Sequence, residues 1–265
     1  MTAFDDFEVQ ELHLFDANCQ LGSSDLTVTN APTSALQLVG EMDRCGIAES
    51  LVCHSWAAGC SPREGNSILM AEISGLPRLH GVWVIVPHHT GEMERPDILV
   101  KQILANQVRA VRMFPLRHRF LLSEWSVNEI LERLNEHRLP LFLDFDRNHW
   151  AEDVVDYCSV RRMSEDFPDL PIVLVREGIG SLRYLYPLLE RCDNLYIETS
   201  YYQTVSGLED ISKRFGSKHL LFGSGLPTYE AGPAISMLIH ADISEQQRRM
   251  VAGDNLRMLV SAVRS

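Results

Sequence analysis

The feature that most constrains the fold is a regular alternation of short apolar segments with amphipathic helical segments. Residues 35–45 are typical of a helix, because Leu36, Val39 and Met42 fall on one face and Gly46 follows as a stop. The alternation continues without a break along the chain. A first strand is predicted from Leu12, followed by strands at 49–54, 80–86, 109–114, 139–145, 172–175, 195–199 and 219–222. The helices are predicted at 35–45, 66–74, 96–106, 123–137, 151–166, 181–191, 205–215, 230–240, 244–251 and 255–263.

Eight strands that alternate with helices require parallel pairing, because each helix carries the chain back to the same end of the sheet. Eight such units within 265 residues predict a (β/α)₈ TIM barrel. The competing fold is an open doubly wound sheet, which usually carries a glycine-rich phosphate loop after its first strand. The sequence has no such loop there, and no linker divides it. We therefore expect one domain over residues 1–265.

Composition limits the partners of the chain. A net charge of -12 argues against binding nucleic acid or an anionic membrane surface. No apolar run is long enough to span a bilayer, and the first residues lack the basic and apolar regions of a signal peptide. The six cysteines are scattered without a Cys-x-x-Cys pair, which favours reduced thiols. We expect a cytoplasmic protein whose partner is a small molecule.

In a barrel of this kind, functional residues gather where the strands end. Polar side chains follow nearly every predicted strand. The first strand leads into an alternating pair of amides, Asn18 and Gln20, which point to the same side, whereas Cys19 points to the other. The residues at the strand ends are Asp16, Asn18, Gln20, His54, His88, His89, Arg112, Asp144, Asp146, Arg176, Glu177, Glu198, Ser200 and Ser224.

Several segments are similar to the amidohydrolase-related family, the metal-dependent hydrolases and decarboxylases built on a (β/α)₈ barrel. The resemblance spans nearly the whole chain. It rests on Phe15-Asp16-Ala17-Asn18 with Gly22, on 108–115, 167–174, 194–200 and 219–227, and on Asn255-Leu256-Arg257-Met258-Leu259 near the end. It implies a barrel whose site lies at the carboxyl ends of the strands.

The metal ligands of that family do not carry over. The resemblance implies two histidines on the first strand, one each on the fifth and sixth, and an aspartate on the eighth. These positions hold Asn18, Gln20, Asp144, Arg176 and Gly225. Amides are poor zinc ligands, and an arginine places a permanent cation where a dication would bind. Glycine also removes the family's proton acceptor. We therefore expect no metal cofactor, and zinc or another divalent ion is disfavoured.

The remaining polar residues suggest catalytic and binding roles. His54 and His88 are candidate general acids or bases because histidine titrates near neutrality, although each has a purely structural alternative. Asp144 is a third candidate catalytic residue, and it could instead form an ion pair with Arg176. Alternatively, Arg176 acts with Arg112 to bind a carboxylate or phosphate. The candidate substrate-binding residues are Asn18, Gln20, Arg112, Arg176, Glu198 and Ser224.

The sequence is compatible with three functions. The first is a metal-free hydrolase, or ligand-binding relative, for a small anionic molecule. The second is a metal-dependent hydrolase or decarboxylase with a rearranged site. The third is a catalytically silent barrel that serves in binding or assembly, with a homodimer among the expected assemblies. Residues 56–64 are expected to form a loop near the site that could act as a lid.

Overall fold

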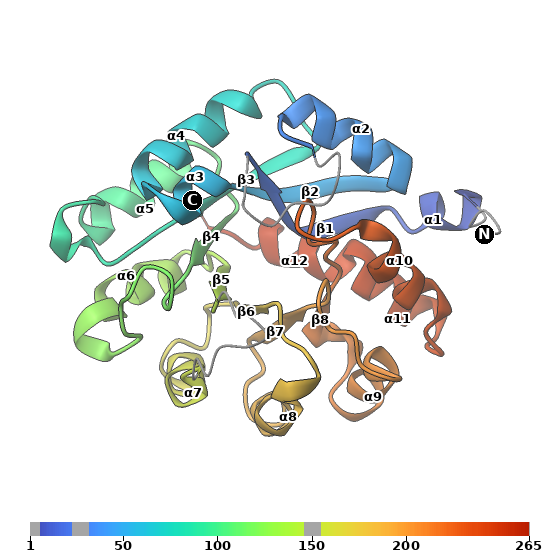
Figure 1. Ribbon diagram of the computed structural model, residues 1–265. Coiled ribbons are helices and arrows are strands. Elements are labelled where there is room, and N and C mark those ends of the chain that lie inside the picture. Colours follow the sequence, from blue (N-terminus) through green and yellow to red (C-terminus); the bar gives the residue numbers. More distant parts are fainter. Residues whose placement is uncertain (1–5, 23–31, 146–154, 265) are drawn as a thin grey trace.

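The computed structural model describes residues 6–22, 32–145 and 155–264. Eight parallel strands follow one another in sequence order around a nearly closed barrel, and helices surround them (Figure 1). The predicted (β/α)₈ barrel is confirmed. Strands β4 to β7 have only four residues each, and almost all of those residues are buried because the barrel interior covers one face and helices cover the other.

The elements have the following bounds. The strands are β1 (Leu14–Leu21), β2 (Ile47–His54), β3 (Leu79–Val84), β4 (Ala110–Met113), β5 (Leu141–Asp144), β6 (Ile172–Val175), β7 (Leu195–Glu198) and β8 (Leu220–Leu221). The helices are α1 (Asp6–Glu11), α2 (Ala35–Cys45), α3 (Ser55–Gly59), α4 (Pro62–Glu72), α5 (Pro96–Ala105), α6 (Glu124–Glu136), α7 (Tyr157–Asp166), α8 (Leu182–Leu189), α9 (Gly207–Arg214), α10 (Ala231–His240), α11 (Glu245–Arg249) and α12 (Asn255–Ser261).

The segment after β8 joins the last strand to the first. The amide of Ala17 donates to the carbonyl of Phe222 at 2.8 Å, and the amide of Gln20 donates to that of Leu226 at 2.8 Å. In the opposite direction, Gly225 donates to the carbonyl of Asn18 at 3.0 Å. The seam of the barrel is therefore made by residues 222–226 rather than by the two-residue strand β8 itself.

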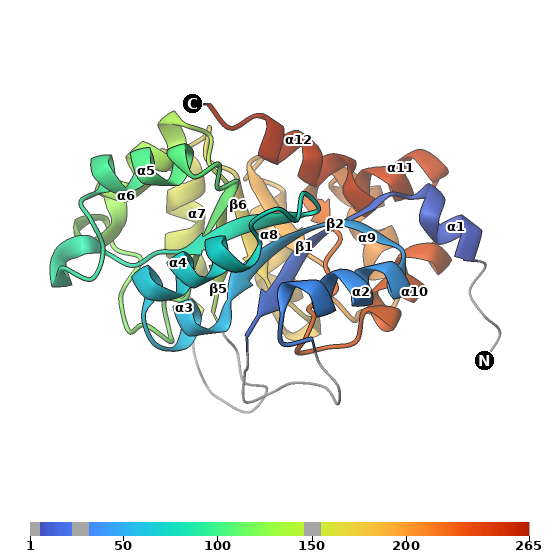
Figure 2. The ribbon, with the colours of Figure 1, turned by 90° about the horizontal axis from the view of Figure 1, so that it is seen from above.

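Helix α12 covers the end of the barrel at which the strands begin (Figure 2). Leu256 and Leu259 pack with the apolar side chains of the barrel interior. Asn255 donates to one backbone carbonyl just before β8 and to one at its first residue, and Arg257 binds Glu49 and the carbonyl of His13. The opposite end, where the strands terminate, is left for the site. No helix in the described ranges is long and apolar enough to cross a membrane.

Helix α2 has the predicted bounds, with Ser34 capping its first turn and Gly46 in a left-handed conformation at its end (φ 72°). The expectation of a loop over 56–64 is wrong, because α3 and the start of α4 occupy this segment. His54 accepts a hydrogen bond from the Trp56 amide and so caps α3, whereas Ser61 caps α4. Part of the helix predicted over 151–166 lies outside the described residues, and α7 forms its last ten residues, 157–166.

Candidate functional site

A β-bulge in β1 sets the direction of Asn18. Between Asp16 and Cys19, β1 carries one residue more than the paired segment of β2. The extra residue reverses the alternation of side chains, because neighbouring strand residues normally point to opposite faces. Ala17 packs in the barrel interior, and Asn18, the next residue, also reaches partners inside the barrel. Cys19 returns to the outer core.

The Asn18 amide joins a basic and an acidic side chain. Its Oδ1 accepts a hydrogen bond from Nη1 of Arg112 at 2.9 Å. Its Nδ2 donates to Oε2 of Glu198 at 3.0 Å and to Oγ of Ser200 at 3.2 Å. An amide can do both because it carries a donor and an acceptor on one planar group. Asn18 therefore connects β1 with β4 and with the end of β7.

Asp144, at the end of β5, lies between two arginines. Arg112 Nη2 donates to Oδ2 of Asp144, and Arg176 donates to Oδ1 through Nε at 3.2 Å and Nη2 at 2.5 Å. The predicted ion pair between Arg176 and Asp144 is thus confirmed. Burial raises the pKa of Asp144, but the two guanidinium groups outweigh it and lower the pKa to about 2. Asp144 is consequently an anchor for the arginines and a poor proton acceptor near neutral pH.

Glu198, at the end of β7, is fully buried, as Asp144 is. The amide of Ser200 donates to its Oε1 at 2.5 Å, and the Ser200 hydroxyl donates to its Oε2 at 2.9 Å. Burial raises the pKa of Glu198 to about 7 despite these hydrogen bonds. Gly223 makes room for the carboxylate, since a Cβ there would lie 1.8 Å from Oε1. A carboxyl group with this pKa can both give and take a proton near neutral pH.

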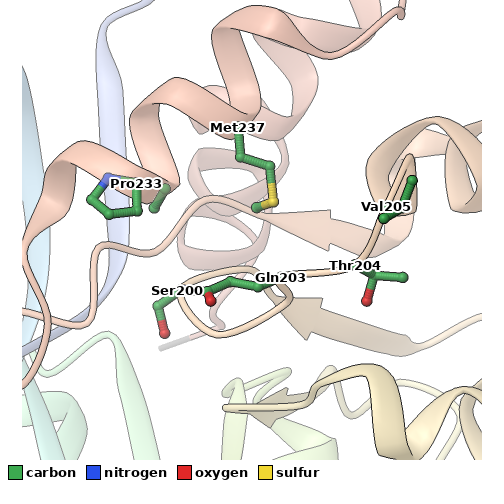
Figure 3. A pocket seen from close by; sticks show the side chains of 7 residues that line it. Ser200, Gln203, Thr204, Val205, Pro233 and Met237 are labelled. Atoms are coloured by element: carbon green, nitrogen blue, oxygen red, sulfur yellow. The ribbon is translucent and has the colours of Figure 1, made fainter. Parts of the chain in front are cut away.

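We refer to Asn18, Arg112, Asp144, Arg176, Glu198 and Ser200 as the mouth network. Its residues come from or directly follow β1, β4, β5, β6 and β7. Ser200 also lines a cavity of about 330 Å³ between the segment after β7 and helix α10. Figure 3 shows Met237 and Pro233 of α10 across this cavity from Gln203 and Thr204. Ser200 therefore contacts the buried Glu198 and also borders this cavity.

Ser224, a predicted substrate-binding residue, is placed in the wall of the barrel. It is fully buried, and its Oγ accepts a hydrogen bond from the amide of Leu226 at 3.1 Å. Its own amide donates to Asp16 Oδ1 at 2.9 Å, and the Cys19 thiol donates to Oδ2 of the same carboxylate at 3.0 Å. Asp16 and Ser224 thus support the turn after β8.

The two candidate catalytic histidines lie outside the mouth network. His54 caps α3, and its Nε2 is 3.7 Å from Glu72. Burial lowers the pKa of His54, which favours the neutral ring. The His88 ring lies against that of His89 at a centroid distance of 4.2 Å and a tilt of 30°, and its Nε2 is 3.8 Å from Glu129.

Of the other predicted residues, the structure describes Gln20 and Glu177 but not Asp146. Gln20 follows Asn18 on the same side of β1 and is half-buried. Asp146 lies outside the described residues. Glu177 is fully buried and accepts a hydrogen bond from the Tyr157 hydroxyl at 2.9 Å. The sequence places Ser200 at a strand end but does not predict it as a substrate-binding residue. Its spacing of two from Glu198 was the signal that the two side chains share a face.

The structure shows other contacts at two of the positions where the resemblance implies metal ligands. Both oxygens of Asp144 already accept hydrogen bonds from guanidinium groups. Gly225 adopts φ 73°, and a Cβ there would lie 2.6 Å from the Tyr229 ring. In the described part of the chain, no group of three or more His, Cys, Asp or Glu side chains is placed to hold a metal ion.

Comparison with known proteins identifies the class to which this barrel belongs. The amidohydrolase family model matches residues 64–259, so the chain belongs to the amidohydrolase family. The matched range begins after β1, the strand that carries Asn18 and Gln20. No curated protein matches the chain by sequence.

Solved structures share the fold at low sequence identity. An uncharacterized TIM-barrel protein from Bordetella bronchiseptica has a TM-score of 0.73 at 16% identity, over 94% of this chain and 98% of that chain. Dihydroxybenzoic acid decarboxylase from Polaromonas sp. JS666, with bound manganese, has a TM-score of 0.71 at 13% identity, over 94% and 96%. A 5-carboxyvanillate decarboxylase from Sphingomonas paucimobilis has a TM-score of 0.69 at 15% identity, over 94% and 99%.

Proposed function

We propose that the chain binds and hydrolyses a small anionic molecule, a carboxylate or a phosphate ester, at the mouth of the barrel without a divalent metal. One observation carries the proposal. Two arginines, Arg112 and Arg176, converge on the buried carboxylate of Asp144 at the mouth of the barrel. A guanidinium group can bind a carboxylate or phosphate through two parallel hydrogen bonds, so this pair of arginines favours an anionic ligand.

Two features of the arginines support anion binding. The side chain of Arg176 remains 20% exposed, whereas Asp144 is fully buried, so a ligand can reach the guanidinium from the mouth. Arg112 is buried, and its Nε has no hydrogen-bond partner among the described residues. A buried donor without a partner is unfavourable, and a ligand oxygen would relieve it.

The chemistry available to such a ligand is proton transfer and charge stabilisation. Glu198 has a pKa near neutrality, and Ser200, which binds its carboxyl group, lines the adjoining cavity. It would accept a proton from a water molecule, and Arg176 would stabilise the negative charge that develops as that water attacks the substrate. His54 and His88 would have no direct part in this reaction, because neither belongs to the mouth network.

A second candidate function is ligand binding without turnover. The histidines lie outside the mouth network, and the low pKa of Asp144 makes it a poor proton acceptor. Glu198 is then the single acid–base group of the network, which favours binding without turnover. The two functions differ in their dependence on Glu198. Substitution Glu198→Gln would abolish hydrolysis, whereas ligand binding would persist.

The first test combines metal analysis with ligand screening. We expect far less than one zinc or manganese per chain by mass spectrometry after growth with both metals, because both oxygens of Asp144 already accept hydrogen bonds from guanidinium groups. Small carboxylates and phosphate esters should raise the melting temperature, since a ligand that binds only the folded state stabilises it.

Arg176→Gln should remove this stabilisation, whereas Arg109→Gln should retain it. Arg109 is a matched control because it is an exposed arginine that precedes β4, at the other end of the barrel. One tightly bound metal per chain, or equal ligand responses in the two variants, would contradict the proposal.

A further inference from the structure

A second cavity, of about 570 Å³, lies among the segments that follow β2, β3 and β4. No residue of the mouth network lines it. Phe114 lies between the two sites, because the Arg112 guanidinium is 5.0 Å from its ring and the His118 ring meets its edge at 5.7 Å. His118 in turn donates from Nε2 to the carbonyl of Ala58 at 2.8 Å, which fixes this wall to α3. We call this space the side cavity.

One part of the side cavity is formed by large apolar side chains that are exposed to solvent. Trp125, in the first turn of α6, is 76% exposed, and Leu121 is 63% exposed. Phe120 lies beside Leu121 and is half-buried. Large apolar side chains that surround a concave space are typical of a ligand site, and the volume falls within the range of roughly 300–1,000 Å³ for small-molecule pockets.

Arg119 supplies a cation at the same cavity. Its backbone is left-handed, with φ 55°, because it ends a turn in which Phe120 donates to the carbonyl of Pro115 at 3.1 Å. Glycine is usual at such a position, and an arginine there bears a strain that glycine would avoid. Among the described residues Arg119 takes part in no ion pair, so its guanidinium is available to a ligand.

The other charged group of the side cavity is the carboxylate of Glu92. Glu92 accepts a hydrogen bond from the Thr90 hydroxyl at 2.6 Å. His89 also lines the space and can donate a further hydrogen bond to an anion.

We propose that the side cavity is a binding site for an aromatic carboxylate. The aromatic ring would lie against Trp125 and Phe120, and the carboxylate would accept hydrogen bonds from Arg119. This proposal is independent of the mouth network, because the two sites share no lining residue. It does not require that the chain be an enzyme.

Two exposed cysteines allow the test to be made on the intact protein. Cys60 lines the side cavity, whereas Cys158 lies in α7, away from it. The alkylation rate of each thiol by iodoacetamide is measured by mass spectrometry while 2-naphthoate is titrated. We expect saturable protection of Cys60 and none of Cys158. Trp125→Ala should weaken binding about tenfold through loss of the aromatic contact.

The charge preference is tested with 2-naphthamide and 2-naphthylmethylamine. The carboxylate should bind more tightly than either compound in the wild type and in Arg109→Gln. Its advantage over the amide should disappear in Arg119→Gln, and Arg176→Gln should leave it unchanged. The proposal is overturned by unsaturable or equal protection of both thiols, by tighter binding of the amine, or by loss of protection in Arg176→Gln. The last result would place the ligand at the barrel mouth instead.

Discussion

The side-chain amide of Asn18 binds a guanidinium and a carboxyl group at once. An aspartate there would lose the donor to Glu198 and would bring a second negative charge beside it. The amide instead holds Glu198 without adding charge. The pKa of Glu198 is therefore set mainly by burial, and this pKa has a measurable effect on stability.

The stability of the protein should fall as pH rises through neutrality because of Glu198. Its pKa is about 7 in the folded state and near 4.5 in the unfolded chain, so the folded state binds the proton more tightly. This contribution is fully present below pH 4.5 and is lost as pH rises through 7. Between pH 5.5 and pH 8 it amounts to about 2 kcal/mol.

Urea unfolding at both pH values should show this loss in the wild type and not in Glu198→Gln. Burial lowers the pKa values of groups such as His54 and His219, so their contribution to stability increases as pH rises. This contribution is present in both the wild type and Glu198→Gln. The difference between the two proteins therefore isolates Glu198. A difference that does not change with pH would show that Glu198 is ionised in the folded state at both pH values.

At the scale of elements, the turn after β8 is matched to the carboxyl group beside it. Gly223 leaves the space that the Glu198 carboxylate fills, and Gly225 follows with a left-handed backbone. The short strand β8 thus depends on two glycines for its continuation along the seam. Neither glycine can take a side chain without moving its surroundings.

Gly223→Ala should lower the free energy of unfolding by about 1 to 3 kcal/mol, because the added methyl group would overlap the Glu198 carboxylate. Gly232→Ala, within α10, is the matched control. A Cβ there meets no atom within 4 Å, and alanine favours the helix, so stability should rise by up to about 1 kcal/mol. Denaturant unfolding measures both variants, and equal effects would contradict this account of the turn.

The elements that sequence patterns predicted well are those whose cause is local. Helix α2 has the predicted bounds because its apolar periodicity, its Ser34 cap and its Gly46 end all lie within the segment. Helix α3 was missed because its cap is a histidine, which is not a usual capping residue. The ion pair of Arg176 with Asp144 was predictable because strand order alone brings the ends of β5 and β6 together.

Two features of the site could not be predicted from local sequence patterns. The bulge in β1 depends on the register with β2, which a single strand does not encode. The pKa of Glu198 depends on side chains from other strands that exclude water. For the same reason, the sequence predicts the histidines as acid–base groups, whereas the function proposed above assigns this role to Glu198.

At the scale of the whole molecule, backbone hydrogen bonds are not distributed equally around the barrel. Backbone hydrogen bonds pair the strands from β1 to β8, but the closing seam relies on residues 222–226. One end is covered by α12, and the other end contains the mouth network, which joins five strands through side chains. The mouth network therefore adds side-chain contacts near a seam that has few backbone contacts.

Native-state hydrogen exchange should reveal this difference. The amides of Ala17, Gln20 and Gly225 should exchange through openings of lower free energy than those of Val111 and Leu141, which lie in the fully paired part of the sheet. Exchange measured at increasing, sub-denaturing urea distinguishes local from global opening. If the seam amides exchange only through global unfolding, the seam is as stable as the rest of the barrel.

The bond between Asn18 and Glu198 joins residues 180 positions apart. During synthesis on the ribosome, Arg112 and Asp144 emerge within 32 residues of one another and can neutralise each other early. Asn18 is synthesised before these residues, but its carboxyl partner becomes available only when β7 has been synthesised. Because long-range contacts form only after the intervening chain is ordered, the acid–base part of the mouth is completed last.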